Sequence, residues 1–89
     1  MKLNWSRAAE ADMDRIWHFL AERSPDLADR IEVALRDGAK RLIDFPYLGR
    51  PRRDGSRELS LPAIQYRIGY LVRDDDILIA AVRSTRENA

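Results

Sequence analysis

Residues 64–86 read IQYRIGYLVRDDDILIAAVRSTR, and this stretch decides the fold. In its first half, apolar residues occupy every second position: Ile64, Tyr66, Ile68, Tyr70 and Val72. This is the period of a β-strand with one buried face. The second half opens with the unbroken apolar run 77–82, typical of a central strand. Asp74 to Asp76 separate the halves, and aspartate favours turns, so the stretch predicts a β-hairpin.

The register of this hairpin carries the main functional clue. A two-residue turn at Asp74 and Asp75 predicts three pairs on the core face: Val72 with Ile77, Tyr70 with Ile79, and Ile68 with Ala81. The same parity turns four residues to the opposite face: Arg67, Val82, Ser84 and Arg86. Two arginines, Arg67 and Arg86, are therefore expected to meet on an open side of the sheet.

Length and composition restrict the classes of protein. The chain has 89 residues, of which 45% are hydrophobic and 35% charged, as expected for one small globular domain spanning residues 1–89. It has no cysteine, which excludes a disulfide scaffold and a thiolate metal site. A net charge of only +1 gives no strong nucleic-acid signature. The lack of cysteine also fits a reducing compartment, so the cytoplasm is the expected location. No apolar run is long enough to span a membrane, so a soluble protein is expected.

Before the hairpin, the sequence predicts one strand and two helices. Lys2 to Trp5 alternates as a short strand, and Ser6 is suited to cap the helix that follows. The apolar stripe of that helix recurs every three or four residues: Ala9, Met13, Ile16, Trp17 and Leu20. Ser24 and Pro25 end it and begin a second helix, which runs to Pro46. The short connection predicts antiparallel helices, with Trp5 and Trp17 in the core beneath them.

Between the second helix and the hairpin lie a loop and one further strand. Tyr47 to Gly55 reads as a loop that carries Arg50, Arg52 and Arg53. This basic loop is either a solvated linker or a site for an anion or a partner. Glu58 to Leu61 alternates as a short strand that Pro62 ends. The predicted class is α+β: an N-terminal strand, an antiparallel helical hairpin and a three-stranded antiparallel meander, with the helices packed on one face of the sheet.

In this order, the motifs resemble those of the ParE/RelE superfamily of type II toxin–antitoxin toxins. The matching pieces are the strand Lys2 to Trp5, the helix with Ala9, Asp12, Asp14 and Ile16, Phe45-Pro46 followed by Gly49-Arg50, Arg57-Glu58-Leu59, and Tyr66-Arg67-Ile68 with its hairpin partner. No single piece is specific, but their order and spacing are. The resemblance covers nearly the whole chain and implies a RelE/ParE-like fold.

The resemblance implies one of two activities. RelE-like toxins are ribosome-dependent mRNA endoribonucleases that use strand lysines, two arginines and a C-terminal tyrosine. In this chain Glu58 and Ser60 stand at the lysine positions, and only Glu87, Asn88 and Ala89 follow Arg86. The sequence is therefore more similar to the ParE-like branch of plasmid-stabilisation toxins, which inhibit DNA gyrase without catalysis and are neutralised by a ParD-like antitoxin. A RelE-like nuclease, or a degenerate toxin that still binds its antitoxin, remains an alternative.

The candidate site residues follow from the strand parity and the resemblance. The candidates for target contact are Arg67, Arg86, Arg83 and Arg57. The alternative for Arg67 is an ion pair with Glu58 across the strands. The candidates for antitoxin contact form an apolar strip on the open face, with one helix residue added: Leu71, Leu78, Ala80, Val82 and Trp17. No catalytic residue, metal or cofactor is predicted, because His18 is the only histidine and the acidic turn lacks the ligand spacing of a calcium loop.

Overall fold

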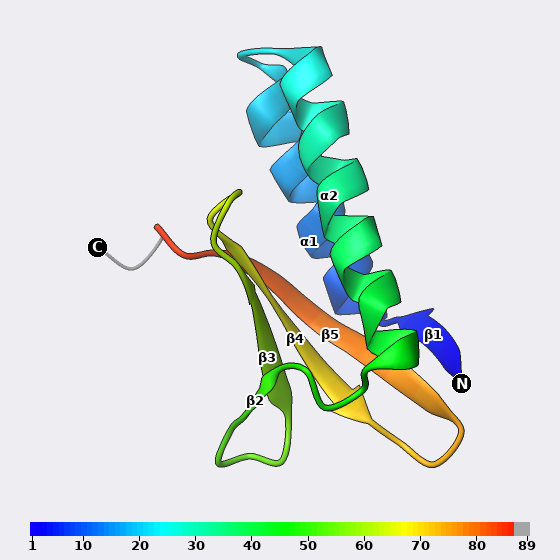
Figure 1. Ribbon diagram of the computed structural model, residues 1–89. Helices are drawn as coiled ribbons and strands as arrows, with labels where there is room; N and C mark the ends of the chain where they lie inside the picture. Colours follow the sequence, from blue (N-terminus) through cyan, green and yellow to red (C-terminus); the bar gives the residue numbers. More distant parts are fainter. Residues whose placement is uncertain (87–89) are drawn as a thin grey trace.

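The computed structural model describes residues 1–86 and has the predicted α+β architecture. The elements are β1 (Lys2–Trp5), α1 (Arg7–Ala21), α2 (Pro25–Asp44), β2 (Arg50–Pro51), β3 (Arg57–Leu61), β4 (Tyr66–Val72) and β5 (Asp76–Ser84). The strand order in the sheet is β1-β5-β4-β3-β2, with β1 parallel to β5 and the other neighbours antiparallel. Both helices cover one face, and their connecting turn projects beyond the sheet (Figure 1).

The helices begin where the sequence predicts. The Ser6 hydroxyl accepts a hydrogen bond from the amide of Ala9 at 3.0 Å, and the Ser24 hydroxyl accepts one from Leu27 at 3.2 Å. Pro25 occupies the first turn of α2, where a missing N–H costs nothing. The apolar stripes of α1 and α2 face the sheet. Trp5 and Trp17 are half-buried at the margin of the core rather than deep within it.

The strand count differs from the predicted one, because the predicted loop 47–55 contains β2. Arg50 and Pro51 pair with Glu58 and Arg57 of β3 and form the edge of the sheet. Because β2 is an edge strand, the missing N–H of Pro51 removes no hydrogen bond from the central strands of the sheet. A two-residue strand has too few positions to produce an alternating pattern, so sequence periodicity could not have revealed it.

The β4–β5 hairpin follows the predicted register only near its turn. Val72 pairs with Ile77 and Tyr70 with Ile79 as predicted, but a β-bulge follows between Gly69 and Tyr70. Beyond it, Ile68 pairs with Val82 rather than with Ala81. The extra residue in β5 exchanges the faces to which the later residues of the strand point. Val82 is therefore fully buried in the core, and its predicted place on the open face is wrong.

The bulge is stabilised by two residues near the start of the chain, the cap of α1 and an acidic residue on α1. A bulge removes backbone groups from the strand ladder, and those groups need other partners. The carboxylate of Asp12 accepts a hydrogen bond from the amide of Val82 at 2.9 Å, and the Ser6 hydroxyl donates to the carbonyl of Ala80 at 3.2 Å. One capping residue and one helix acid therefore stabilise the irregularity that the sequence pattern did not show.

The hairpin turn lies at Asp74 and Asp75 as predicted, with the amide of Arg73 donating to the carbonyl of Asp76 at 2.9 Å. The carboxylate of Asp76 accepts hydrogen bonds from the guanidinium of Arg73 and from the side-chain amide of Asn4. These contacts, the one with Arg73 first, lower the pKa of Asp76 from 3.8 to about 2. The acidic turn thereby also ties β1 to the start of β5.

Candidate functional site

The open face of the sheet carries a cluster of arginines around one carboxylate. Glu58 on β3 accepts a hydrogen bond from Nη1 of Arg52 at 2.9 Å, and the same oxygen lies 3.7 Å from Nε of Arg67 on β4. Arg83 on β5 is the strand partner of Arg67. The Arg67–Glu58 pair anticipated as the alternative for Arg67 is therefore present. We call Arg52, Glu58, Arg67 and Arg83 the arginine–glutamate cluster.

The carboxylate of Glu58 defines what this cluster can do. Its side chain is only 14% exposed, so it is held between the arginines rather than swung into solvent. Nε of Arg67 is buried without a hydrogen-bond partner, which leaves the Glu58 carboxylate as its only compensating charge among the described residues. Ser60, the strand partner of Arg67, offers neither positive charge nor a group that takes up a proton near neutral pH. The one carboxylate of the cluster, that of Glu58, is thus engaged by Arg52 and Arg67.

Arg86 does not join Arg67, contrary to the prediction. The bulge reverses the parity of β5, so Arg83 takes the position opposite Arg67. Arg86 instead lines a groove of about 500 Å³ between α1 and the adjoining ends of β4 and β5. The groove-lining residues are Arg15, Ile16, Phe19, Leu20, Arg23, Tyr66, Ser84 and Arg86.

Sequence reasoning missed Phe19 as a member of this groove. Phe19 is 60% exposed and lies outside the apolar stripe of α1, which includes Ile16 and Leu20. A large apolar residue on the polar side of an amphipathic helix is a signal that the pattern already contained. The groove has an apolar floor, an exposed aromatic ring and three arginines, with no acidic residue in its lining.

Arg57 is engaged within the protein. Its guanidinium donates hydrogen bonds to the carbonyls of Tyr47 and Gly49 and lies 4.9 Å from the centre of the Tyr47 ring. Arg57 therefore fixes the α2–β2 connection, and its predicted contact with a target stays untested. Arg50 and Arg53 of the basic loop have no ion-pair partner within residues 1–86, whereas Arg52 is engaged with Glu58.

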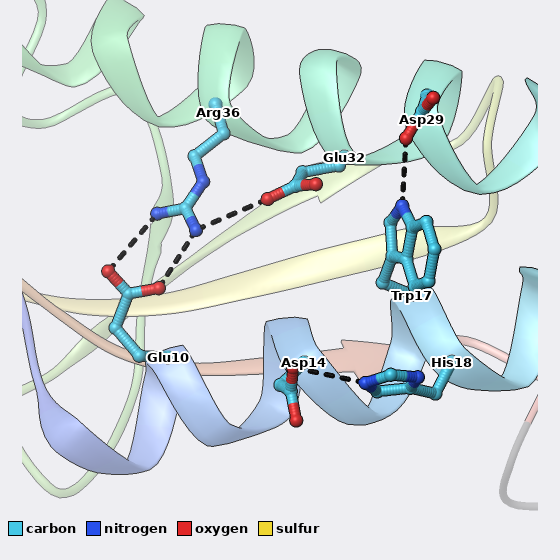
Figure 2. Close-up of polar contacts among 7 residues, drawn as sticks. All are labelled: Glu10, Asp14, Trp17, His18, Asp29, Glu32 and Arg36. Carbon is cyan, nitrogen blue, oxygen red and sulfur yellow. Dashed lines mark hydrogen bonds and ion pairs between the residues drawn. The ribbon is translucent and has the colours of Figure 1, made fainter.

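The residues predicted for antitoxin contact do not form one surface. Leu71 and Leu78 pair with each other on the open face and are half-buried, as is Ala80 at the bulge. Val82 belongs to the core. Trp17 lies on α1, and its indole N–H donates to the carboxylate of Asp29 on α2 at 2.9 Å (Figure 2). A short apolar strip therefore remains on the open face, without Val82 and separate from Trp17.

The remaining polar cluster ties the two helices together. Figure 2 shows Arg36 of α2 reaching both Glu10 of α1 and Glu32 on its own helix. The distance from Nη2 of Arg36 is 2.8 Å to Glu10 and 3.5 Å to Glu32. The guanidinium also lies 4.3 Å from the centre of the Trp5 ring. The hydrogen bond with Glu10 is the largest cause of the raised pKa of Arg36. His18 is exposed and lies 3.4 Å from Asp14 on the same helix, outside this helix-to-helix contact.

Two further features of residues 1–86 bear on function. No group of three or more histidine, cysteine, aspartate or glutamate side chains is arranged there to hold a metal ion. Neither helix in this part of the chain is long and apolar enough to cross a membrane. Residues 87–89, where a RelE-like tyrosine would be sought, lie outside the described part of the chain.

Comparison with known proteins identifies relatives over almost the whole chain. Residues 3–89 match the family model described as the ParE toxin of the type II toxin–antitoxin system parDE. A protein of Caulobacter vibrioides named Toxin RelE3 is 32% identical over 81 residues, covering 89% of this chain and 88% of that protein.

Two solved structures share the fold. A chain of the chromosomal ParDE toxin–antitoxin system from P. aeruginosa superposes with a TM-score of 0.83 at 27% identity, covering 97% of both chains. A conserved hypothetical protein of Helicobacter pylori has a TM-score of 0.61 at 20% identity, covering 94% of this chain and 93% of that one. At that identity, the second similarity concerns the fold alone.

Proposed function

Because the chain belongs to the ParE toxin family of type II toxin–antitoxin systems, we propose that it inhibits DNA gyrase without catalysis and is neutralised by a ParD-like antitoxin. The structural similarity to a ParDE system supports the antitoxin as partner. The toxin would form a hetero-oligomer with that antitoxin. Gyrase acts in the cytoplasm, so the proposal also assigns the toxin to that compartment.

The observation that carries the non-catalytic part of this proposal is the position of Glu58. Cleavage of RNA by attack of a ribose hydroxyl needs a proton acceptor and positive charge around the phosphate. In the arginine–glutamate cluster, the carboxylate of Glu58 lies 3.7 Å from Nε of Arg67 and accepts a hydrogen bond from Arg52, so it occupies the place beside Arg67 that a phosphate would need and is engaged rather than free to take up a proton. Glu58 thus supports a role in which Arg67 and Arg83 contact a protein rather than cleave a nucleic acid.

The groove beside α1 is our candidate for the antitoxin contact. Its floor of Ile16, Leu20 and Tyr66 is apolar, while Arg23 and Arg86 at its margin have no ion-pair partner within residues 1–86. A partner segment with apolar residues flanked by carboxylates would complement both features. Changing Phe19 to Ser should weaken antitoxin binding about tenfold or more in calorimetric titration. Val33, which is 58% exposed on α2, provides the matched control, since Val33→Ser should change affinity less than about twofold.

Supercoiling by purified gyrase tests the proposal. The wild-type protein should inhibit supercoiling and accumulate gyrase-linked cleaved plasmid, and adding the antitoxin should abolish both effects. Arg67→Ala should reduce this inhibition and the growth arrest on expression, while antitoxin affinity stays within about twofold. Unchanged growth arrest with Arg67→Ala would remove this arginine from the target contact.

A RelE-like endoribonuclease is the second candidate, favoured by the relative named Toxin RelE3 at 32% identity. The pairing of Arg67 with Arg83 supplies two of the positive groups that such chemistry uses. Primer extension on transcripts held in translating ribosomes distinguishes the candidates. Cuts at the ribosomal A site, absent when Arg67 and Arg83 are both changed to Ala, would establish the nuclease and refute the non-catalytic proposal.

A further inference from the structure

The connection between α2 and β2 exposes an unusual concentration of apolar side chains. Phe45 is 63% exposed, Tyr47 68% and Leu48 44%, and these three residues lie within four positions. With Ile43, they make up four of the seven large hydrophobic residues that residues 1–86 leave exposed. Contiguous exposed apolar surface is rare on soluble monomers except at interaction sites. We call residues 45–48 the aromatic loop.

The backbone of the aromatic loop is fixed by hydrogen bonds to Tyr70 in the core. This tyrosine is fully buried, and its hydroxyl donates to the carbonyl of Pro46 at 2.9 Å and accepts from the amide of Gly49 at 2.7 Å. A Cβ atom at Gly49 would lie 2.6 Å from that hydroxyl, so only glycine allows the loop to approach so closely. A buried hydroxyl thus fixes both ends of the stretch that carries Tyr47 and Leu48.

Arg57 holds the same loop from the side. Its guanidinium donates to the carbonyls of Tyr47 and Gly49 and lies 4.9 Å from the centre of the Tyr47 ring. A loop fixed at three carbonyls and one amide loses little conformational entropy when a partner binds it. Rigid backbone combined with exposed aromatic side chains is the arrangement found at the energetic centres of protein interfaces.

We propose that the aromatic loop is a further part of the surface through which this toxin engages its target protein, in addition to Arg67, with Phe45, Tyr47 and Leu48 as anchors. Arg50 and Arg53, which follow the loop and have no ion-pair partner within residues 1–86, add positive charge beside it. The complementary target surface is an apolar pocket with carboxylates at its rim. The proposal rests on the proposed function only for the identity of that target.

A protein fits this surface better than a nucleic acid does. Phe45 and Leu48 offer apolar contact, and leucine has no planar face on which a base can stack. One face of the Tyr47 ring is already covered by Arg57, whose guanidinium is engaged with carbonyls and is not free for phosphate. The net charge of +1 also gives little general attraction for DNA or RNA.

The aromatic loop is well separated from the groove that we assign to the antitoxin. The groove involves residues 15–23, from the second half of α1 and the turn that follows it, whereas the loop follows the opposite end of α2 (Figure 1). A helix of 20 residues is about 30 Å long, so one short partner segment does not cover both places. Target binding and antitoxin binding should therefore respond separately to substitution.

The test compares Phe45→Ser and Tyr47→Ser with Val33→Ser, since Val33 is similarly exposed but lies within α2. Each purified variant is titrated against gyrase holoenzyme in the supercoiling assay and against programmed ribosomes in a translation assay, and its affinity for the cognate antitoxin is measured by calorimetry. For whichever target the wild type inhibits, the concentration that gives half-maximal inhibition should be at least about tenfold higher for the loop variants. Val33→Ser should stay within about twofold, as should all antitoxin affinities.

The outcomes separate this inference from the proposed function. Inhibition of ribosomes instead of gyrase refutes the proposed target, but loss of that inhibition in the loop variants still supports the loop. Where neither target responds in vitro, growth arrest on expression replaces the assay, and the loop variants should allow growth. Full potency of both loop variants overturns the inference. A parallel loss of antitoxin affinity, or a loss of affinity for a DNA duplex probe equal to the loss for gyrase, also overturns it.

Discussion

Changing Tyr70 to Phe removes a single oxygen atom from the centre of the fold. In the wild type, this hydroxyl makes hydrogen bonds of 2.7 Å with the amide of Gly49 and 2.9 Å with the carbonyl of Pro46. Tyr70 is 0% exposed, so water cannot replace the lost partner at the buried Gly49 amide without rearrangement. Each hydrogen bond contributes about 1 kcal/mol net, and an unsatisfied buried amide adds about 1 kcal/mol more.

The expected loss is therefore about 2–3 kcal/mol in the free energy of unfolding. For a domain of this size, this corresponds to a melting temperature lower by about 10–20 °C. Urea unfolding followed by the fluorescence of Trp5 and Trp17 provides the measurement, since both tryptophans pack against the core.

Tyr47→Phe is the matched control, because it removes the same atom from a side chain that is 68% exposed. Its free energy of unfolding should stay within about 0.5 kcal/mol of the wild type. A Tyr70→Phe variant as stable as this control would refute the reasoning that the hydroxyl holds the loop. Tyr70→Phe should also lose inhibition of the target, whereas Leu35→Ala, a core variant expected to cost about 2–5 kcal/mol, should keep it at temperatures where both are folded.

Three further predictions concern other parts of the molecule. Glu58→Gln leaves the Arg67 guanidinium without its carboxylate, so unfolding free energy should fall by about 1 kcal/mol while inorganic phosphate raises the melting temperature more than in the wild type. Gly49→Ala forces a Cβ to within 2.6 Å of the Tyr70 hydroxyl, and urea unfolding should report a loss of about 1–3 kcal/mol. The pKa of Asp76 is lowered from 3.8 to about 2, so its ionised carboxylate stabilises the fold fully above pH 3.8. That stabilisation is lost as the pH falls towards 2. In Asp76→Asn, the free energy of unfolding should therefore depend less on pH between 3.8 and 2 than in the wild type.

Much of the fold was predictable because its signals are local and periodic. The caps at Ser6 and Ser24, the two apolar helix stripes and the turn at Asp74 and Asp75 all depend on residues close together in the chain. The parallel pairing of β1 with β5 is different, since it joins residues more than seventy positions apart, such as Lys2 and Asp76. Neither strand alone carries a signal for that partner.

The errors in the candidate site have one physical source. The bulge in β5 is stabilised by a hydrogen bond from Val82 to Asp12 on α1, and a pattern of alternation within β5 contains no information about that contact. The residues of β5 beyond the bulge were therefore assigned to the wrong faces of the sheet. This error placed Val82 on the open face and Arg86, instead of Arg83, beside Arg67.

The aromatic loop was hidden from the sequence for another reason. Phe45, Tyr47 and Leu48 are apolar residues next to a helix end, and composition alone would assign them to the core. Their exposure follows from where Tyr70 and Arg57 hold the backbone, which depends on the packing of β3 and β4. By contrast, the pairing of Arg67 with Glu58 was accessible, because diagonal neighbours on adjacent antiparallel strands lie on one face within reach of long side chains.

The central claim is that this toxin acts on gyrase and cleaves no RNA. The most direct test is a coupled transcription–translation reaction on a supercoiled plasmid with gyrase present, in which plasmid topology and transcript ends are read from the same sample. The account predicts cleaved or relaxed plasmid with intact transcripts, and protection of the plasmid when antitoxin is added. Supercoiled plasmid together with transcripts cut at the ribosomal A site would contradict it.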